Sequence, residues 1–177
     1  MTKDAQIQHG SAKLAFNTEM DFEYGAAKDI APNVRRIVAN NPGPFTFKGT
    51  NTYIVGRGNV AVIDPGPDDP EHTEAIVRAV GKERISHILI THTHRDHTDG
   101  IAPLREHTDA PVLAFGETGQ ERGAQTTSPS GKAFVDLGFE PDEILRHGDE
   151  VSGDGWTLDV IHTPGHAPDH LCFALAG

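Results

Sequence analysis

The chain has 177 residues, which corresponds to one domain when a domain spans roughly 100 to 200 residues. Hydrophobic residues make up 36% of the chain and charged residues 23%, which is typical of a globular protein and excludes collagen-like and low-complexity classes. The formal net charge of −11 opposes long-range attraction to nucleic-acid phosphates, because that attraction depends on Lys and Arg.

The N-terminal segment lacks the continuous apolar stretch that a secretory signal needs. The longest apolar runs, at residues 60–63 and 88–90, are much shorter than the ~20 residues that cross a bilayer. We therefore predict a cytoplasmic protein that does not enter a membrane. Residues 1–30 show no sustained periodicity and are interpreted as a lead-in segment, and residues 31–177 as one domain.

The first part of this domain predicts strands followed by a helix. Three strand-like segments are separated by turn residues and suggest an antiparallel start: residues 34–38, 51–55 and 60–64. Asp69 is expected to cap a helix that begins at Pro70 and ends before Gly81. A buried strand at residues 85–90 then leads into a histidine-rich loop.

The second part continues the alternation of helix and strand. A helix is expected from Thr98 to about His107, and residues 116–138 have the composition of a long surface connection that can contact substrate. The remaining strands are expected at residues 111–114, 150–151, 156–161 and 171–175. The order of elements predicts a single α/β domain.

Histidines cluster in two short windows. Six of the 11 histidines lie in residues 92–97 and 162–170. Alternation at the end of a strand places His92 and His94 on one side, and the following turn presents Asp96 and His97 to a second position. Imidazole beside carboxylate suits Zn²⁺, so one loop can serve two metals, although a solvated polar loop is the alternative.

A third ligand for the first metal has to come from elsewhere, because a catalytic zinc site usually has three protein ligands. His166 is the best candidate, since Pro164 and Gly165 orient the turn that carries it after a predicted strand. Cys172 is the only cysteine, which excludes an intrachain disulfide and a thiolate-rich zinc cluster. The residues therefore favour a catalytic metal site.

The motifs resemble those of the metallo-β-lactamase superfamily. The similar segments occur in the family's order: Val-Ile-Asp64-Pro-Gly, His92-Thr-His94-Arg-Asp96-His97 and Thr-Pro-Gly-His166. Two further segments resemble the β-lactamase-like protein 2 branch: Asn41-Pro-Gly-Pro-Phe-Thr-Phe-Lys-Gly-Thr-Asn51-Thr-Tyr-Ile-Val and Pro-Gly-His166-Ala-Pro-Asp169-His170. The resemblance implies an αββα sandwich with the metals at one edge of the paired sheets.

The resemblance also implies individual roles. In relatives with these motifs, the residues that correspond to His92, His94 and His166 hold the first metal, and those that correspond to Asp96 and His97 help to hold the second. Asp64 is expected to orient a ligand through the histidine's other ring nitrogen. His170 belongs to the branch-like Asp-His pair and is a candidate substrate contact. The family's later bridging Asp and final His are not in this sequence, so we expect a domain truncated at its C-terminus.

These features predict a metal-dependent hydrolase. Metal-bound hydroxide would attack a carbonyl or a phosphodiester, with Asp96 as a ligand that also handles a proton. We expect two Zn²⁺ ions per complete domain, with iron or manganese as alternatives. The substrate is a small molecule, such as a β-lactam or thioester, or RNA. An iron-dependent oxidoreductase of the same fold and a non-catalytic metal-binding module are the competing interpretations.

Overall fold

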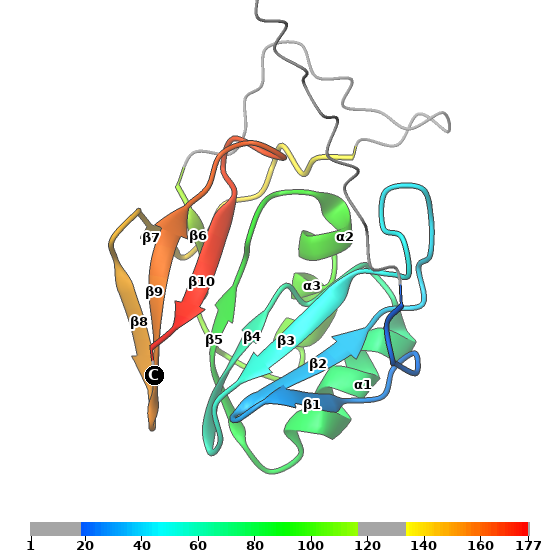
Figure 1. Cartoon of the computed structure of the whole chain (residues 1–177). Coiled ribbons are helices and arrows are strands. Elements are labelled where there is room, and N and C mark those ends of the chain that lie inside the picture. Colours follow the sequence, from blue (N-terminus) through cyan, green and yellow to red (C-terminus); the bar gives the residue numbers. More distant parts are fainter. Residues whose placement is uncertain (1–18, 117–133, 177) are drawn as a thin grey trace, which may run out of the picture.

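A seven-stranded sheet forms the centre of the structure, a computed structural model that describes residues 19–116 and 134–176. Its strands lie in the order of the sequence (Figure 1): β1 (Lys28–Ala31), β2 (Val34–Val38), β3 (Asn51–Val55), β4 (Asn59–Ile63), β5 (Arg84–Leu89), β6 (Val112–Phe115) and β7 (Glu143–Leu145). Strands β1 to β4 pair antiparallel, as the sequence predicts for β2 to β4, whereas β4 to β7 pair parallel.

Helices connect the parallel strands that follow one another in the sheet. Helix α1 (Pro70–Val80) links β4 to β5, and the short helices α2 (Arg95–Thr98) and α3 (Ile101–Arg105) link β5 to β6. The Asp69 carboxylate accepts a hydrogen bond from the backbone N–H of Glu71 at 3.0 Å, and Pro70 occupies the first turn. Gly81 ends the helix at a φ of 61°, so the predicted boundaries of α1 are confirmed.

The central strands are buried on both faces, which explains their nearly continuous apolar sequences. Val60 and Val62 of β4 pack on the side of helix α1, against residues such as Ile76. Ala61 and Ile63, which alternate with them, belong to a second hydrophobic core. The large sheet therefore separates two cores, one beneath the helices and one beneath a second sheet.

The second sheet contains three antiparallel strands in the order β10-β9-β8: β8 (Glu150–Gly153), β9 (Trp156–His162) and β10 (Leu171–Leu175). Trp156 fastens it to the large sheet, because its indole Nε1 donates to the carbonyl of Asn59 at 2.8 Å. A Cβ atom at Gly56 or Gly153 would lie 2.3 or 2.4 Å from this ring. The close approach of the two sheets at Trp156 therefore depends on both glycines.

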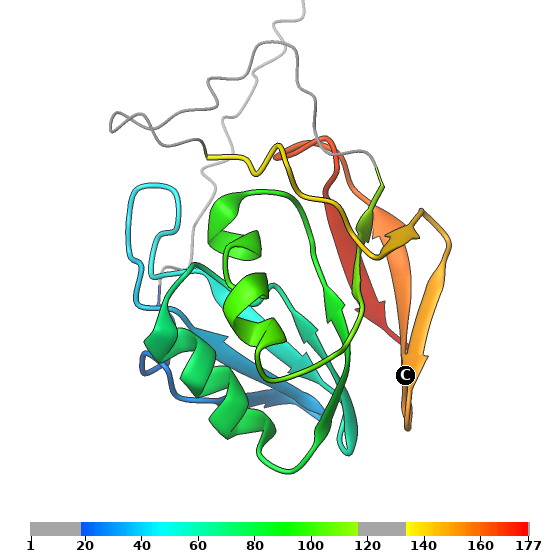
Figure 2. The ribbon, with the colours of Figure 1, turned by 180° about the vertical axis from the view of Figure 1, so that it is seen from behind.

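The layers agree with the predicted α/β class. Figures 1 and 2 show the helices on one face of the large sheet and the small sheet on the other. All three helices in the described residues lie on that first face, so the outer helical layer of an αββα sandwich is not among residues 19–116 and 134–176. None of the helices described is long and apolar enough to span a membrane.

The structure differs from the sequence-based prediction at three places, one of which is strand β7, which was not predicted. Residues 28–31 form β1, which was not predicted because all four side chains are exposed and give no burial pattern. The helix expected from Thr98 begins earlier and is divided into α2 and α3. The division lies at Gly100, whose N–H donates to the carbonyl of Gly66 and whose missing side chain allows contact with Pro65. Residues 1–18 of the predicted lead-in and residues 117–133 of the predicted connection lie outside the described residues.

Candidate metal centre

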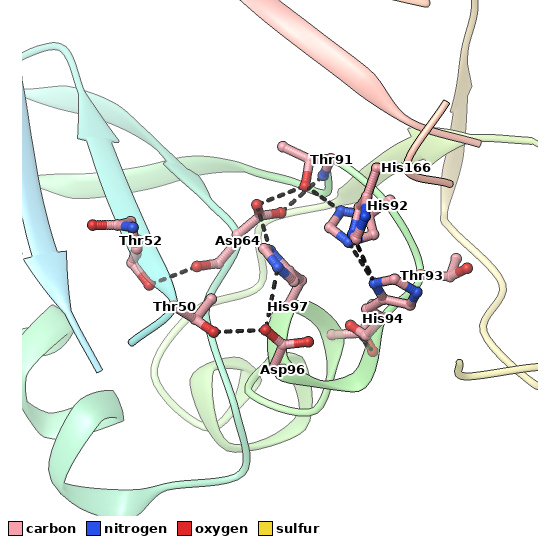
Figure 3. A network of polar contacts seen from close by, with 12 residues as sticks. Thr50, Thr52, Asp64, Thr91, His92, Thr93, His94, Asp96, His97 and His166 are labelled. Carbon is pink, nitrogen blue, oxygen red and sulfur yellow. Dashed lines mark hydrogen bonds and ion pairs between the residues drawn. The ribbon is translucent and has the colours of Figure 1, made fainter. Parts of the chain in front are cut away.

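Two segments far apart in the sequence meet at one end of the sheets. His92 and His94 follow β5, and the turn between β9 and β10 carries His166. The N–H of Leu171, at the start of β10, donates to the carbonyl of Thr91 at 2.7 Å and joins the two segments. As Figure 3 shows, the histidine side chains point toward one another.

Three ring nitrogens converge in this cluster. His94 Nδ1 lies 2.9 Å from His92 Nε2 and 3.2 Å from His166 Nε2. Four ligands at 2.0–2.1 Å around a tetrahedral zinc ion are separated by about 3.3 Å. The two separations from His94 are close to this value, and all three nitrogens lie within 4.8 Å of one another, so this group could hold a metal ion.

The hydrogen bonds behind His92 fix which nitrogen faces the cluster. The Thr91 hydroxyl lies 2.7 Å from the Asp64 carboxylate, to which it donates its only proton. Its oxygen is then free to accept from Nδ1 of His92 at 2.9 Å. Nε2 of His92 is therefore left without a proton and points at His94, which is the arrangement of a metal-ligating imidazole.

Burial lowers the pKa of two of these imidazoles, those of His92 and His94. Burial, followed by the neighbouring histidines, lowers the pKa of His92 to about 2. The pKa of His94 is lowered by burial and then by the nearby His166 ring. Neutral imidazole is the form that binds metal, so the cluster is prepared for a cation at neutral pH.

Asp96 and His97 form a second pair beside the first cluster. Both lie in helix α2, which begins directly after His94, and Asp96 Oδ2 is 3.3 Å from His97 Nε2. His97 uses its Nδ1–H to donate to Asp64 Oδ2 at 2.8 Å. Without a second proton on the ring, a nitrogen lone pair and a carboxylate oxygen face one another, and a cation between them would satisfy both.

The charged neighbours of His97 act on its ionisation. Burial alone would lower the pKa of His97, but the Asp64 carboxylate, its hydrogen bond and Asp96 outweigh burial and raise it. In the absence of metal, the ring therefore holds a proton more strongly than an ordinary histidine. A divalent cation would replace that proton.

Asp64 is placed where sequence analysis expected a residue that orients a ligand. It follows β4 with a φ of 53°, an unusual value for a residue with a side chain. Its carboxylate accepts from the N–H and hydroxyl of Thr91 and from His97, all at 2.7–2.8 Å. Its carbonyl accepts from the Thr52 hydroxyl at 2.6 Å. One buried aspartate thus fixes the orientation of both His92 and His97.

Asp169 connects the turn between β9 and β10 to the loop that carries His92 and His94. It is buried, and its Oδ2 accepts from the backbone N–H of Thr93 at 2.9 Å. His170 lies at the edge of the cluster, with its ring centroid 5.1 Å from that of His92 and its Nδ1 2.9 Å from the Thr163 hydroxyl. A contact between His170 and the substrate stays a prediction.

Two residues close to the pair in α2 were not predicted from the sequence. Thr50 donates from its hydroxyl to Asp96 Oδ2 at 2.7 Å, and Asn41 contacts Thr50 through both atoms of its amide. Both residues lie in the segment that resembles the β-lactamase-like protein 2 branch. That segment was the signal, but 46 residues separate Thr50 from Asp96, so sequence spacing did not reveal their contact.

Similar proteins with solved structures share this fold. A metallo-beta-lactamase from Cronobacter sakazakii, with substitutions in its HARLDQ motif, superposes with a TM-score of 0.65 at 25% identity over 85% of this chain and 59% of that chain. A subclass B3 metallo-beta-lactamase of Bradyrhizobium japonicum gives a TM-score of 0.64 at 22% identity over 86% and 58% of the respective chains.

Curated relatives are more similar in sequence. A lactamase-like protein of Pestalotiopsis microspora is 37% identical over 99% of this chain and 53% of that protein. An atrochrysone carboxyl ACP thioesterase of Aspergillus chevalieri is 37% identical over 82% of this chain and 42% of that protein. The chain thus spans about half the length of these relatives.

A family profile extends the similarity over most of the chain. The profile described as "Metallo-beta-lactamase superfamily" matches residues 45–177, which include every residue of the two predicted metal positions. Together with the fold, this match confirms the family resemblance stated from the motifs. The chain belongs to the metallo-beta-lactamase superfamily.

Proposed function

We propose that this chain is the metal-binding part of a zinc-dependent hydrolase that cleaves acyl thioesters. The observation that carries the proposal is the convergence of three ring nitrogens, from His92, His94 and His166, within 4.8 Å of one another. Neutral imidazoles are common ligands of zinc. Iron and manganese are the alternative metals, and elemental analysis would distinguish them from zinc. The domain predicted at residues 31–177 carries all the residues concerned.

Asp96 and His97 serve a second metal position in this proposal. Bound at these positions, divalent cations would lower the pKa of water and polarise the carbonyl under attack. The Asp96 carboxylate, partly exposed beside the histidine cluster, both holds a cation and accepts a proton from the attacking water. Asp64 keeps His97 in the tautomer whose Nε2 faces Asp96.

A thioester is the substrate class that the relatives favour. One curated relative at 37% identity is named as an acyl carrier protein thioesterase, and another at 34% identity, from Emericella nidulans, is named as a thioesterase. A thioester carbonyl is open to attack by water without a protein nucleophile. The net charge of −11 disfavours RNA, the other substrate that the motifs allow.

The decisive experiment is a comparison of substrates and metals. Metal-free protein would be loaded with Zn²⁺, Fe²⁺ or Mn²⁺ and assayed with an acyl-pantetheine thioester, a β-lactam and a single-stranded RNA. We expect thioester hydrolysis that requires zinc and is lost in His166→Ala. Zinc binding without turnover of any of the three substrates would instead support a non-catalytic module, and oxygen consumption with iron would support an oxidoreductase.

A further inference from the structure

Asp96 has a partner that belongs to neither histidine segment. The Thr50 hydroxyl lies 2.7 Å from Asp96 Oδ2, the same oxygen that lies 3.3 Å from His97 Nε2. Thr50 is buried, at 4% exposure, and directly precedes β3. The contact therefore connects the start of β3, an inner strand of the large sheet, to the carboxylate proposed for the second metal.

Asn41 holds Thr50 from the other side. Its amide oxygen accepts from the backbone N–H of Thr50 at 2.9 Å, and its amide nitrogen donates to the Thr50 hydroxyl oxygen at 3.1 Å. A carboxylate can only accept, so the single hydroxyl proton of Thr50 goes to Asp96. The two hydrogen bonds of the Thr50 hydroxyl consequently run in one direction, from the Asn41 amide nitrogen through the hydroxyl to Asp96, and the first polarises the second.

The loop at residues 40–50 is built to place these two residues together. The Thr46 hydroxyl donates to the carbonyl of Asn41 at 2.6 Å, and the N–H of Ala39 donates to the carbonyl of Thr50 at 2.9 Å. Gly49 has a φ of 130°, and a Cβ atom there would lie 2.1 Å from the Ala39 carbonyl oxygen. The turn that brings Thr50 to Asp96 thus requires glycine at position 49.

We propose that Thr50, oriented by Asn41, is a positioning residue that fixes the Asp96 carboxylate for the second metal. The inference rests on the proposed function, because it assumes that Asp96 and His97 bind a cation. Hydrogen-bonded partners of metal ligands typically contribute 10–100-fold to metal affinity. Loss of the Thr50 hydroxyl should lower the metal affinity of the second position by that factor and leave the metal affinity of the first position unchanged.

Zinc titration of the metal-free protein by calorimetry tests this assignment without an activity assay. Thr50→Val keeps the shape of the side chain and removes the hydroxyl, whereas Thr50→Ser restores the hydroxyl. Thr73→Val is the matched control, because Thr73 is also 4% exposed and its hydroxyl donates only to a backbone carbonyl, in helix α1. The titration has a second step, which is the binding of the second zinc ion. We expect this second-step binding to be about 10–100-fold weaker in Thr50→Val and unchanged in Thr50→Ser and Thr73→Val.

Asn41→Asp tests the direction of the hydrogen bonds. The new carboxylate is nearly the same size, but it cannot donate to the Thr50 oxygen and competes with Asp96 for the hydroxyl proton. This variant should weaken second-step binding as Thr50→Val does, with first-step binding within about threefold of the unmodified chain and far short of the 10–100-fold cost of a lost ligand partner.

Several results would overturn the assignment. Unchanged second-step binding in Thr50→Val would do so, as would an equal loss of both steps or a failure of Thr50→Ser to restore binding. Asp96→Asn separates this failure from that of the proposed function. If Asp96→Asn leaves the second step intact, the second metal position itself is refuted; if it removes that step while Thr50→Val does not, only the role of Thr50 is refuted.

Discussion

The side chains of Asp64 and His97 meet at 2.8 Å between Oδ2 and Nδ1, although 33 residues separate them in the sequence. This contact fixes the histidine tautomer, because a carboxylate accepts only from an N–H. Nε2 of His97 is thereby turned toward Asp96, where a cation would replace the second proton of the ring. The Asp64 carboxylate is therefore central to the proposed second metal position.

Asp64→Asn should reverse that tautomer. The amide oxygen can still accept from the backbone N–H of Thr91, which turns the amide N–H₂ toward His97 and the Thr91 hydroxyl and requires Nδ1 of His97 to accept. The proton then moves to Nε2, where it blocks a cation. We expect second-step zinc affinity to fall by about 10–100-fold and unfolding free energy by about 1–3 kcal/mol, measured by calorimetry and urea denaturation.

The control for this substitution is Asp68→Asn, since Asp68 is exposed and lies only four positions away. It should leave both zinc affinity and unfolding free energy unchanged. Zinc binding by Asp64→Asn that matches the unmodified chain would show that the tautomer of His97 is not set by Asp64.

His166→Ala should remove one of the three proposed ligands of the first metal position. Its loss should cost more than the 10–100-fold typical of a partner that acts behind a ligand, because the remaining pair, His92 and His94, cannot complete a catalytic zinc site. Zinc affinity measured against a competing chelator would report the loss. His147→Ala is the control, because His147 is exposed and not in the cluster; equal affinities in the two variants would refute the ligand assignment.

His72 should make stability depend on pH. Burial lowers the pKa of His72 from 6.5 to about 4, so the unfolded chain takes up a proton at a higher pH than the folded chain. Stability is then fully present above pH 6.5 and is lost as the pH falls toward 4. The loss is on the order of 3 kcal/mol, from 1.36 kcal/mol per pKa unit.

Urea denaturation of metal-free protein between pH 7 and pH 4 measures this dependence. His72→Gln cannot titrate, and its amide can still donate to Thr52, whose hydroxyl oxygen is 2.7 Å from His72 Nε2. Comparison with the unmodified chain cancels the contribution of the other histidines. Identical pH dependence of the two proteins would contradict the burial-induced shift.

Gly153→Ala should separate the two sheets at Trp156. The added methyl group would lie 2.4 Å from the indole ring, which is packed between Gly153 and Gly56. Overpacking of this kind costs about 1–3 kcal/mol of unfolding free energy. Gly138→Ala is the control, because the closest atom to its Cβ would lie at an ordinary 3.8 Å; similar melting temperatures for the two variants would argue against the close contact at Trp156.

The local elements of this protein could be predicted from its residues alone. Strand-like segments separated by turn residues predicted strands β2, β3 and β4, and a capping aspartate, a proline and a glycine predicted helix α1. The metal-ligand types were also recognisable, because His92, His94, Asp96 and His97 lie within six consecutive residues. Signals of this kind involve residues that are close together in the sequence, so they can be recognised from sequence spacing alone.

The contacts between distant groups around the site could not be predicted from the sequence. Thr50 meets Asp96 across 46 residues, and His72, which no sequence motif singled out, is buried against Thr52. Strand β1 shows no burial pattern because all its residues are exposed, and its position follows from pairing with β2. Such contacts depend on how sheets and loops pack together. Local periodicity in the sequence does not predict a hydrogen bond between two segments that meet only after folding.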